Sequence, residues 1–263
     1  MQPILVATDF SAASQNALRF AARLSLFRKC PLAVVHAYSL AIPNMEPLLI
    51  PTGVQYLEND ATNALASVQE TLLTEFPGVQ AEFVKLPAAD IASELADYCT
   101  QRQPFLLVLG THERSGAESW FSEGLRLVHK SSVPLLMVPE GFSGTGWMRA
   151  VLAYDGAPLQ PLQQQRVTTI MSELHALLDV VHVQSSRGSD PEFPQFGTVA
   201  GHNHTVLAEN VTTGLLSYLK ENPSDLMVVL PHHHSMWERL FMRRHTPSLV
   251  SQLPVPVLVM PED

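Results

Sequence analysis

Histidines gather in two parts of the chain where they could bind a metal ion or respond to pH. His202 and His204 lie close together, and His232, His233 and His234 follow one another. Neutral imidazoles from two loops are suitable ligands for zinc. No cysteine is nearby, and adjacent histidines in a turn point in different directions, so we expect no metal site. Clustered imidazoles would gain charge between roughly pH 5 and 7, which makes a pH-responsive patch the related alternative.

The motifs of two large enzyme classes are missing from the sequence. The chain has no Gly-x-Ser-x-Gly elbow, and Ser11, Ser14 and Ser122 have no assignable base for nucleophilic catalysis. It also has no Gly-x-x-x-x-Gly-Lys-Ser/Thr loop, which excludes an NTPase of that class. We therefore expect a protein that binds ligands or partners rather than one that turns over a substrate.

Two aspartates follow short runs that favour β-strands. Asp9 follows residues 3–8, and Asp155 follows residues 150–154. An aspartate in this place can cap the next helix, which in the first case would begin near Ser11. Whether Asp9 also contacts a ligand depends on the elements that position it.

The composition indicates a folded protein of one large domain or two ordinary ones. Of the 263 residues, 46% are hydrophobic and only 16% are charged, which argues against disorder. The net charge of −9 argues against general binding to nucleic acids or anionic membranes, because phosphates would be repelled. Cys30 and Cys99 form no CxxC pair, and no apolar run reaches the roughly 18 residues of a membrane span. We expect a reduced, cytoplasmic protein.

One heptapeptide pattern occurs twice. Residues 134–140 read Pro-Leu-Leu-Met-Val-Pro-Glu and residues 256–262 read Pro-Val-Leu-Val-Met-Pro-Glu, an offset of 122 residues (256 − 134). Each copy closes a similar succession of elements, so we predict two homologous modules, 1–140 and 147–263, with a linker at 141–146. Asp9 and Asp155 are 146 residues apart, so the second module lacks about two dozen residues (146 − 122) between its second and third strands.

Both halves alternate strands with helices. In the first we predict strands at 3–8, 32–38, 81–86, 105–109 and 135–138 and helices at 12–29, 56–76, 90–102 and about 111–131. In the second we predict strands at 150–154, 179–183, 205–208, 226–230 and 256–260, helices at 160–177 and 211–220, and a loop at 184–204. The strands are continuous apolar runs, as in sheets covered by helices on both faces. This pattern predicts an α/β fold with parallel sheets.

This order of elements resembles the universal stress protein family in its tandem form. The resemblance rests on the runs 3–11, 32–37, 107–112 and 133–139 and covers essentially the whole chain, more faintly from 184 to 204. It implies two doubly wound five-stranded parallel sheets, with the layering of adenine-nucleotide α-hydrolase-like and flavodoxin-like folds. It also implies that strands 135–138 and 257–260 meet antiparallel, which makes an internal pseudo-dimer and covers two sheet edges. A homodimer of the whole chain is a further option.

The resemblance also implies an ATP site at the carboxyl ends of the first and fourth strands, where ligands bind in doubly wound sheets. The matching positions in the first module are Thr8, Asp9 and Ala37 toward the nucleoside and Gly110, Thr111 and Ser122 toward the phosphates. The family pattern is Gly-x-x-Gly, a gap of about nine residues, and Gly-Ser or Gly-Thr, which exposes backbone N–H groups to phosphate. Here Glu113 replaces the second glycine and would repel a polyphosphate. Gly116 would replace that second glycine if the loop is rearranged. The final Gly-Ser falls on Phe121-Ser122, with Gly124 close by.

The second module departs further from the family pattern. Asp155 remains, but the fourth strand ends at Leu230 and Pro231, and the loop after it has no glycine. Pro231 has no N–H group, so it cannot replace a phosphate-facing glycine. We expect nucleotide binding in the first module only.

These observations predict a cytoplasmic stress-response protein that binds ligands or protein partners, with a degraded ATP cleft in its first module. One alternative is a nucleotide-free scaffold that signals through protein contacts. The enzyme alternative is slow ATP hydrolysis or adenylyl chemistry, and it requires a set of metal-binding carboxylates that we do not find in the sequence.

Overall fold

The chain is described by a computed structural model that covers residues 1–40, 50–111, 130, 132–186, 188–189, 191–230 and 253–261. It divides into two compact units, Met1–Glu140 (unit 1) and Gly141–Asp263 (unit 2). In the described residues, each unit combines helices with a sheet of parallel strands. The α/β class predicted from the sequence is confirmed.

The sheet of unit 1 has five parallel strands among the described residues, in the order β3-β2-β1-β4-β5. These are β1 (Ile4–Ala7), β2 (Leu32–Ser39), β3 (Ala81–Ala88), β4 (Leu106–Thr111) and β5 (Leu135–Pro139). The central strands are buried on both faces, which explains their continuous apolar sequence. The chain leaves β1 toward β2 and β3 and then returns to β4 on the other side of β1. The carboxyl ends of β1 and β4 therefore form a topological switch point.

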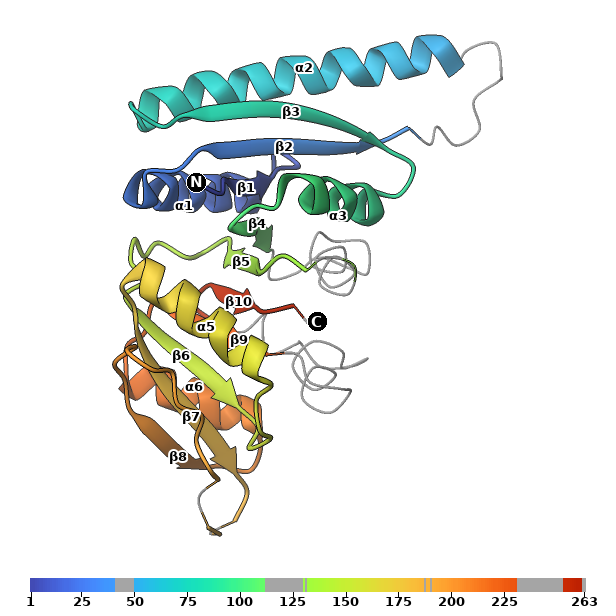
Figure 1. Ribbon diagram of the computed structural model, residues 1–263. Coiled ribbons are helices and arrows are strands. Elements are labelled where there is room, and N and C mark those ends of the chain that lie inside the picture. Colours follow the sequence, from blue (N-terminus) through green and yellow to red (C-terminus); the bar gives the residue numbers. More distant parts are fainter. Residues whose placement is uncertain are drawn as a thin grey trace. The chain divides into compact units, whose positions relative to one another are not determined.

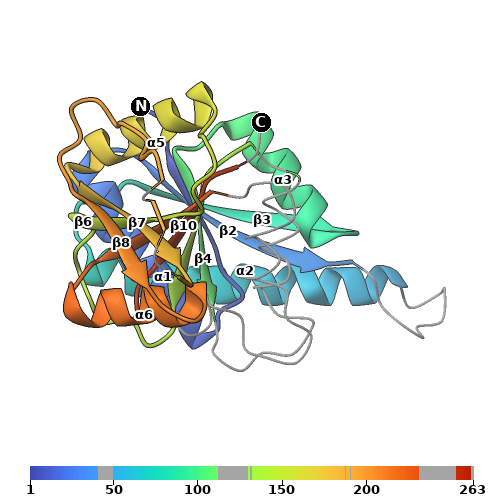
Figure 2. The same ribbon diagram turned by 90° about the horizontal axis from the view of Figure 1, so that it is seen from below.

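Helices cover both faces of the unit 1 sheet. They are α1 (Ala12–Arg28), α2 (Ile50–Glu75) and α3 (Ile91–Arg102). Figure 2 shows α1 and α2 on one face and α3 on the other. The predicted cap of α3 is present, because the Asp90 carboxylate accepts a hydrogen bond from Ser93 N at 2.8 Å.

Two boundaries in unit 1 differ from the prediction. Helix α2 begins at Ile50 rather than Tyr56, and Pro51 is compatible with this because a proline in the first turn removes no intrahelical hydrogen bond. Strand β4 continues to Thr111, two residues beyond the predicted end, because Gly110 serves a packing contact rather than a turn. The predicted helix at about 111–131 lies almost wholly outside the described residues.

Unit 2 repeats this architecture in a shorter form. Its described strands are β6 (Arg149–Tyr154), β7 (Leu177–Gln184), β8 (Asn203–Leu207), β9 (Leu226–Val229) and β10 (Val257–Val259), parallel and in the order β10-β9-β6-β7-β8. Helices α5 (Pro161–Leu174) and α6 (Val211–Glu221) lie on opposite faces (Figure 2). Helix α5 ends three residues before the predicted position because His175 adopts a left-handed conformation (φ 53°) that stops the helix.

The main difference between the units lies after their second strands. In unit 1 the long helix α2 packs on β2 and β3 (Figure 1). In unit 2 the described residues between β7 and β8 contain no helix. Phe196 from this stretch is buried, with 7% of its surface exposed, and Phe193 is half-buried. An irregular segment with two aromatic side chains thus follows β7 where a helix follows β2.

Candidate functional site

The turn after β1 is held by a chain of hydrogen bonds through hydroxyl groups. Phe10 N donates to Thr8 Oγ1 at 3.0 Å, and Ser14 Oγ donates to Ser11 O at 3.0 Å. Because the Ser14 hydroxyl is already a donor, Thr8 Oγ1 donates to Ser14 Oγ across 3.1 Å. Thr8 is 1% exposed, so its hydroxyl serves the turn and is shielded from solvent.

Asp9 is half-buried in the same turn. Ser11 donates two hydrogen bonds to Asp9 Oδ1, from N at 3.1 Å and from Oγ at 2.5 Å. Ser11 itself is the N-cap of α1, and its hydroxyl accepts from Ser14 N. Asp9 therefore supports the capping residue instead of capping the helix itself. Burial alone would raise the pKa of Asp9, but the hydrogen bonds from Ser11, together with the nearby Ser14 hydroxyl, outweigh it and lower the pKa, so the carboxylate stays ionised.

His36 on β2 supports the turn from the neighbouring strand. Its Nδ1 lies 2.8 Å from Thr8 O, and since a carbonyl only accepts, Nδ1 carries a proton and donates it to this oxygen. The His36 ring lies between two aromatic rings, with centroid distances of 4.3 Å to Phe10 and 5.8 Å to Tyr38. Phe10 has a positive φ of 65°, which is uncommon for a bulky residue. The sequence analysis did not single out His36 or Phe10. A signal for His36 was present, because His182 follows it by 146 residues (182 − 36), the same spacing as between Asp9 and Asp155.

Gly110 lies inside β4, paired with Val138 of β5. A Cβ on Gly110 would lie 2.3 Å from the carbonyl carbon and oxygen of Ala13 and 2.6 Å from Ser14 N. The glycine is thus explained by the close approach of α1 to β4. Thr111 ends the strand, 7% exposed, and its carbonyl accepts from Glu140 N at 3.0 Å.

The remaining predicted positions are only partly described. Ala37 is buried on β2, two residues beyond Val35, which pairs with the last residue of β1. Thr8, Asp9, Ala37, Gly110 and Thr111 therefore all lie at the carboxyl ends of β1, β2 and β4. Ser122, with Glu113, Gly116 and Gly124, lies outside the described residues. The structure thus describes the strand ends of the site but not the loop that would face phosphates.

Comparison with known proteins agrees with the α/β fold. The model of the universal stress protein family matches residues 1–139, just over half of the chain. The chain belongs to the universal stress protein family. A universal stress protein from Archaeoglobus fulgidus DSM 4304 has a similar fold, with a TM-score of 0.70 at 15% identity, over 99% of this chain and 96% of that one. The functionally unknown protein PA1789 from Pseudomonas aeruginosa PAO1 is also similar, with a TM-score of 0.56 at 10% identity. That match covers 100% of this chain and 93% of that one.

A curated relative is similar over a shorter stretch. The sensor protein KdpD of Mycobacterium tuberculosis is 34% identical over 101 residues, which is 35% of this chain. The chain spans only 12% of the length of that sensor protein. Within the described residues, no helix combines the length and apolar character that crossing a bilayer requires.

Unit 2 of this universal stress protein carries an altered version of the same turn. Asp155 Oδ1 accepts from Ala157 N at 2.9 Å, and Gly156, the counterpart of Phe10, also has a positive φ, 91°. His182 Nδ1 lies 3.1 Å from Tyr154 O, which repeats the contact between His36 and Thr8. The turn geometry is thus kept, but Tyr154 replaces Thr8 and there is no side chain at position 156.

Two histidines of unit 2, His202 and His204, lie close together at the start of β8. His202 N donates to Asp179 Oδ1 at 2.9 Å, and the rings of His202 and His204 are 6.3 Å apart. The Tyr218 hydroxyl donates to Asp179 Oδ2 at 3.3 Å; burial, together with the charge of Asp179, raises the pKa of Tyr218 to about 12. No three His, Cys, Asp or Glu side chains in the described part of the chain are grouped to hold a metal ion. His232, His233 and His234 lie outside that part.

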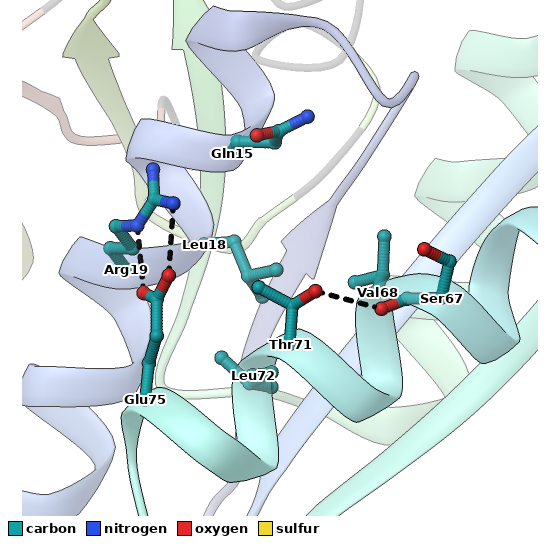
Figure 3. A pocket seen from close by; sticks show the side chains of 8 residues that line it. All are labelled: Gln15, Leu18, Arg19, Ser67, Val68, Thr71, Leu72 and Glu75. Carbon is teal, nitrogen blue, oxygen red and sulfur yellow. Dashed lines mark hydrogen bonds and ion pairs between the residues drawn. The ribbon is translucent and has the colours of Figure 1, made fainter.

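A groove between α1 and α2 is separate from the predicted site. It has a volume of about 100 Å³ and is lined by apolar side chains such as Leu18 and Leu72 (Figure 3). At one end Arg19 donates to both carboxylate oxygens of Glu75, at 2.8 and 3.0 Å, which lowers the pKa of Glu75. None of the six predicted site residues lines this groove.

Proposed function

We propose that this universal stress protein is a cytoplasmic stress-response protein that binds an adenine nucleotide, ATP, in unit 1. The observation that carries the proposal is the ionised Asp9 at the switch point between β1 and β4. Ser11 uses Oδ1 of this carboxylate, which leaves Oδ2 as the acceptor for a ribose hydroxyl. The base would lie against the buried end of β2 at Ala37, and the phosphates near Gly110, Thr111 and Ser122.

We further propose that the protein binds ligands or partners rather than turning over ATP. Phosphoryl transfer usually depends on bound metal ions that neutralise the developing charge. No carboxylate in the described residues belongs to a group of three potential metal ligands. Unit 2 would bind no nucleotide, because Leu230 and Pro231 stand where unit 1 has Gly110 and Thr111.

A nucleotide-free scaffold that acts through protein contacts is the second candidate. Two observations favour it. The Thr8 hydroxyl and Asp9 Oδ1 are already used by hydrogen bonds inside the turn, so the turn is complete without a ligand. In addition, Glu113 places a negative charge in the segment that would face phosphates.

Thermal unfolding in the presence of ATP separates the two candidates. A ligand that binds only the native state stabilises it, by about 2.7 kcal/mol at a hundredfold excess over Kd. We expect millimolar ATP to raise the Tm of the wild-type chain and of Asp155→Ala, and to leave the Tm of Asp9→Ala unchanged relative to its own ligand-free form. Absence of any shift in the wild-type chain would favour the scaffold.

A further inference from the structure

The segment Pro191–Phe196 of unit 2 runs across the carboxyl end of β6. The Tyr154 hydroxyl donates to Glu192 O at 3.0 Å, and the ring of Phe193 lies 6.0 Å from that of Tyr154. A Cβ on Gly156 would come within 3.7 Å of the Pro191 side chain. The segment therefore contacts both the last residue of the strand and the turn that follows it.

The same segment continues along helix α5. The Gln164 side-chain amide donates to Gln195 O, and the next residue, Phe196, is buried. Gln164 lies in the first half of α5. The segment is thus attached at the strand end, at the turn and on the helix, and its aromatic residues are turned into the protein.

These contacts fall on the counterparts of the candidate site in unit 1. At the offset of 146 residues, Tyr154 corresponds to Thr8, Gly156 to Phe10, and His182 to His36. In unit 1 the ring of Phe10 lies over His36. In unit 2 position 156 has no side chain, a Cβ there would lie 3.2 Å from His182 Cε1, and Pro191 approaches the same point.

We propose that residues 191–196 form a strap that covers the carboxyl end of β6 and the turn after it, at the position where unit 1 has its candidate site. Tyr154 and Phe193 anchor the strap, and its release opens an apolar surface suited to a planar aromatic ligand, because a phenyl ring now occupies that surface. The strap thereby covers in unit 2 the turn whose counterpart in unit 1 is not covered by a segment of this kind among the described residues, since helix α2 follows β2 there. This holds whether or not unit 1 binds a nucleotide.

Hydrogen exchange of the full-length chain, followed by mass spectrometry, tests the anchors. Tyr154→Phe removes the hydrogen bond to Glu192 O and keeps the ring, so exchange in peptides covering 191–196 should accelerate about fivefold. Phe193→Ala should accelerate it by roughly tenfold or more. Tyr218→Phe is the matched control, since it removes a hydroxyl hydrogen bond elsewhere in unit 2 and should leave the strap unchanged.

Binding of the dye anilinonaphthalene sulfonate tests the closure itself. This aromatic anion reports exposed apolar surface. The expected result is stronger dye fluorescence for Tyr154→Phe and Phe193→Ala than for the wild-type chain or Tyr218→Phe, at a temperature where circular dichroism shows all four folded. Should Phe193→Ala fail to fold, Tyr154→Phe decides. Equal exchange and equal fluorescence in Tyr154→Phe and the wild-type chain would overturn the proposal.

Discussion

At the scale of single residues, the turn after β1 shows how a short polar sequence builds an internally hydrogen-bonded turn at a strand end. Hydrogen bonds join Thr8 to Ser14, Ser14 to Ser11 and Ser11 to Asp9. His36 on the neighbouring strand donates to Thr8 O. Each donor in this small network has an acceptor within the turn. The carboxylate of Asp9 is therefore fixed in place before any ligand arrives, which reduces the entropy that binding would cost.

The lowered pKa of Asp9 predicts how stability depends on pH. The unfolded carboxyl has a pKa of about 3.9, and the folded one titrates below that. Its hydrogen bonds therefore stabilise the native state fully above about pH 5, and this contribution is lost as the pH falls through the folded pKa. We expect Asp9→Asn to reduce the free energy of unfolding by about 1 kcal/mol at pH 7 and by less at pH 3.

Urea unfolding of the wild-type chain and Asp9→Asn at the two pH values measures this difference. Asp155→Asn serves as the comparison from unit 2, where one backbone N–H donates to the carboxylate. A gap between wild type and Asp9→Asn that widens as the pH falls would show that the folded pKa is raised instead.

At the scale of elements, one glycine decides how closely a helix can approach the sheet. Gly110 of β4 faces the backbone of Ala13 and Ser14 in the first turn of α1. Its counterpart in unit 2 is Leu230 (230 − 110 = 120, the offset of the fourth strands), which is 3% exposed. Ala13 corresponds to Leu159, which precedes α5. Unit 2 accommodates a leucine at this position because α5 begins about one turn later after its strand than α1 does.

This packing predicts that adding a single methyl group at Gly110 strongly destabilises unit 1. Gly110→Ala places a methyl group 2.3 Å from backbone atoms that cannot rotate away. We expect it to lower the free energy of unfolding of unit 1 by about 1–3 kcal/mol or more, as overpacked cores do. Gly141→Ala is the control, because nothing lies within 4 Å of the added methyl group.

Thermal and urea unfolding of both alanine variants check this expectation. The control should stay within about 0.5 kcal/mol of the wild-type chain. Equal stability of Gly110→Ala and Gly141→Ala would mean that α1 can move away from β4 at little cost.

At the scale of the whole molecule, the two units repeat details that a sheet fold alone does not require. Phe10 and Gly156 both have a positive φ, and Lys29 and His175 both end their helices in the left-handed conformation with φ 53°. All of these pairs share the offset of 146 residues. The repetition of unusual backbone conformations at one spacing supports the descent of both units from a single module.

Pairing of the units through their last strands stays a prediction from the family resemblance. β5 pairs with β4 along one edge, and β10 pairs with β9 along one edge. If β5 and β10 also pair with each other, the N–H groups on their opposite edges donate to that partner strand. We expect these outward amides to be protected from hydrogen exchange in the full-length chain, as measured by NMR. The outward amides of β8, the last strand on the other side of unit 2, provide the comparison. Exchange that is as fast in β5 as in β8 would contradict the pairing.

The sequence by itself was sufficient for the α/β class, the order of the elements and the position of Asp9 at a strand end. These follow from local patterns, since apolar runs, helical periodicity and capping residues act over a few neighbours. It was misleading for the end of β4, because we expected the strand to stop at residue 109 and it continues through Gly110 to Thr111. The reason for that glycine is the backbone of Ala13, almost a hundred residues earlier in the chain.

Only the tertiary structure decided which side chains meet. His36 on β2 reaches the carbonyl of Thr8 at the end of the neighbouring β1, and the strap of unit 2 reaches Tyr154 from a segment without regular structure. Such contacts join residues that are far apart in sequence, and they form only after the strands have paired. No local pattern records them, because their geometry is set by the packing of whole elements.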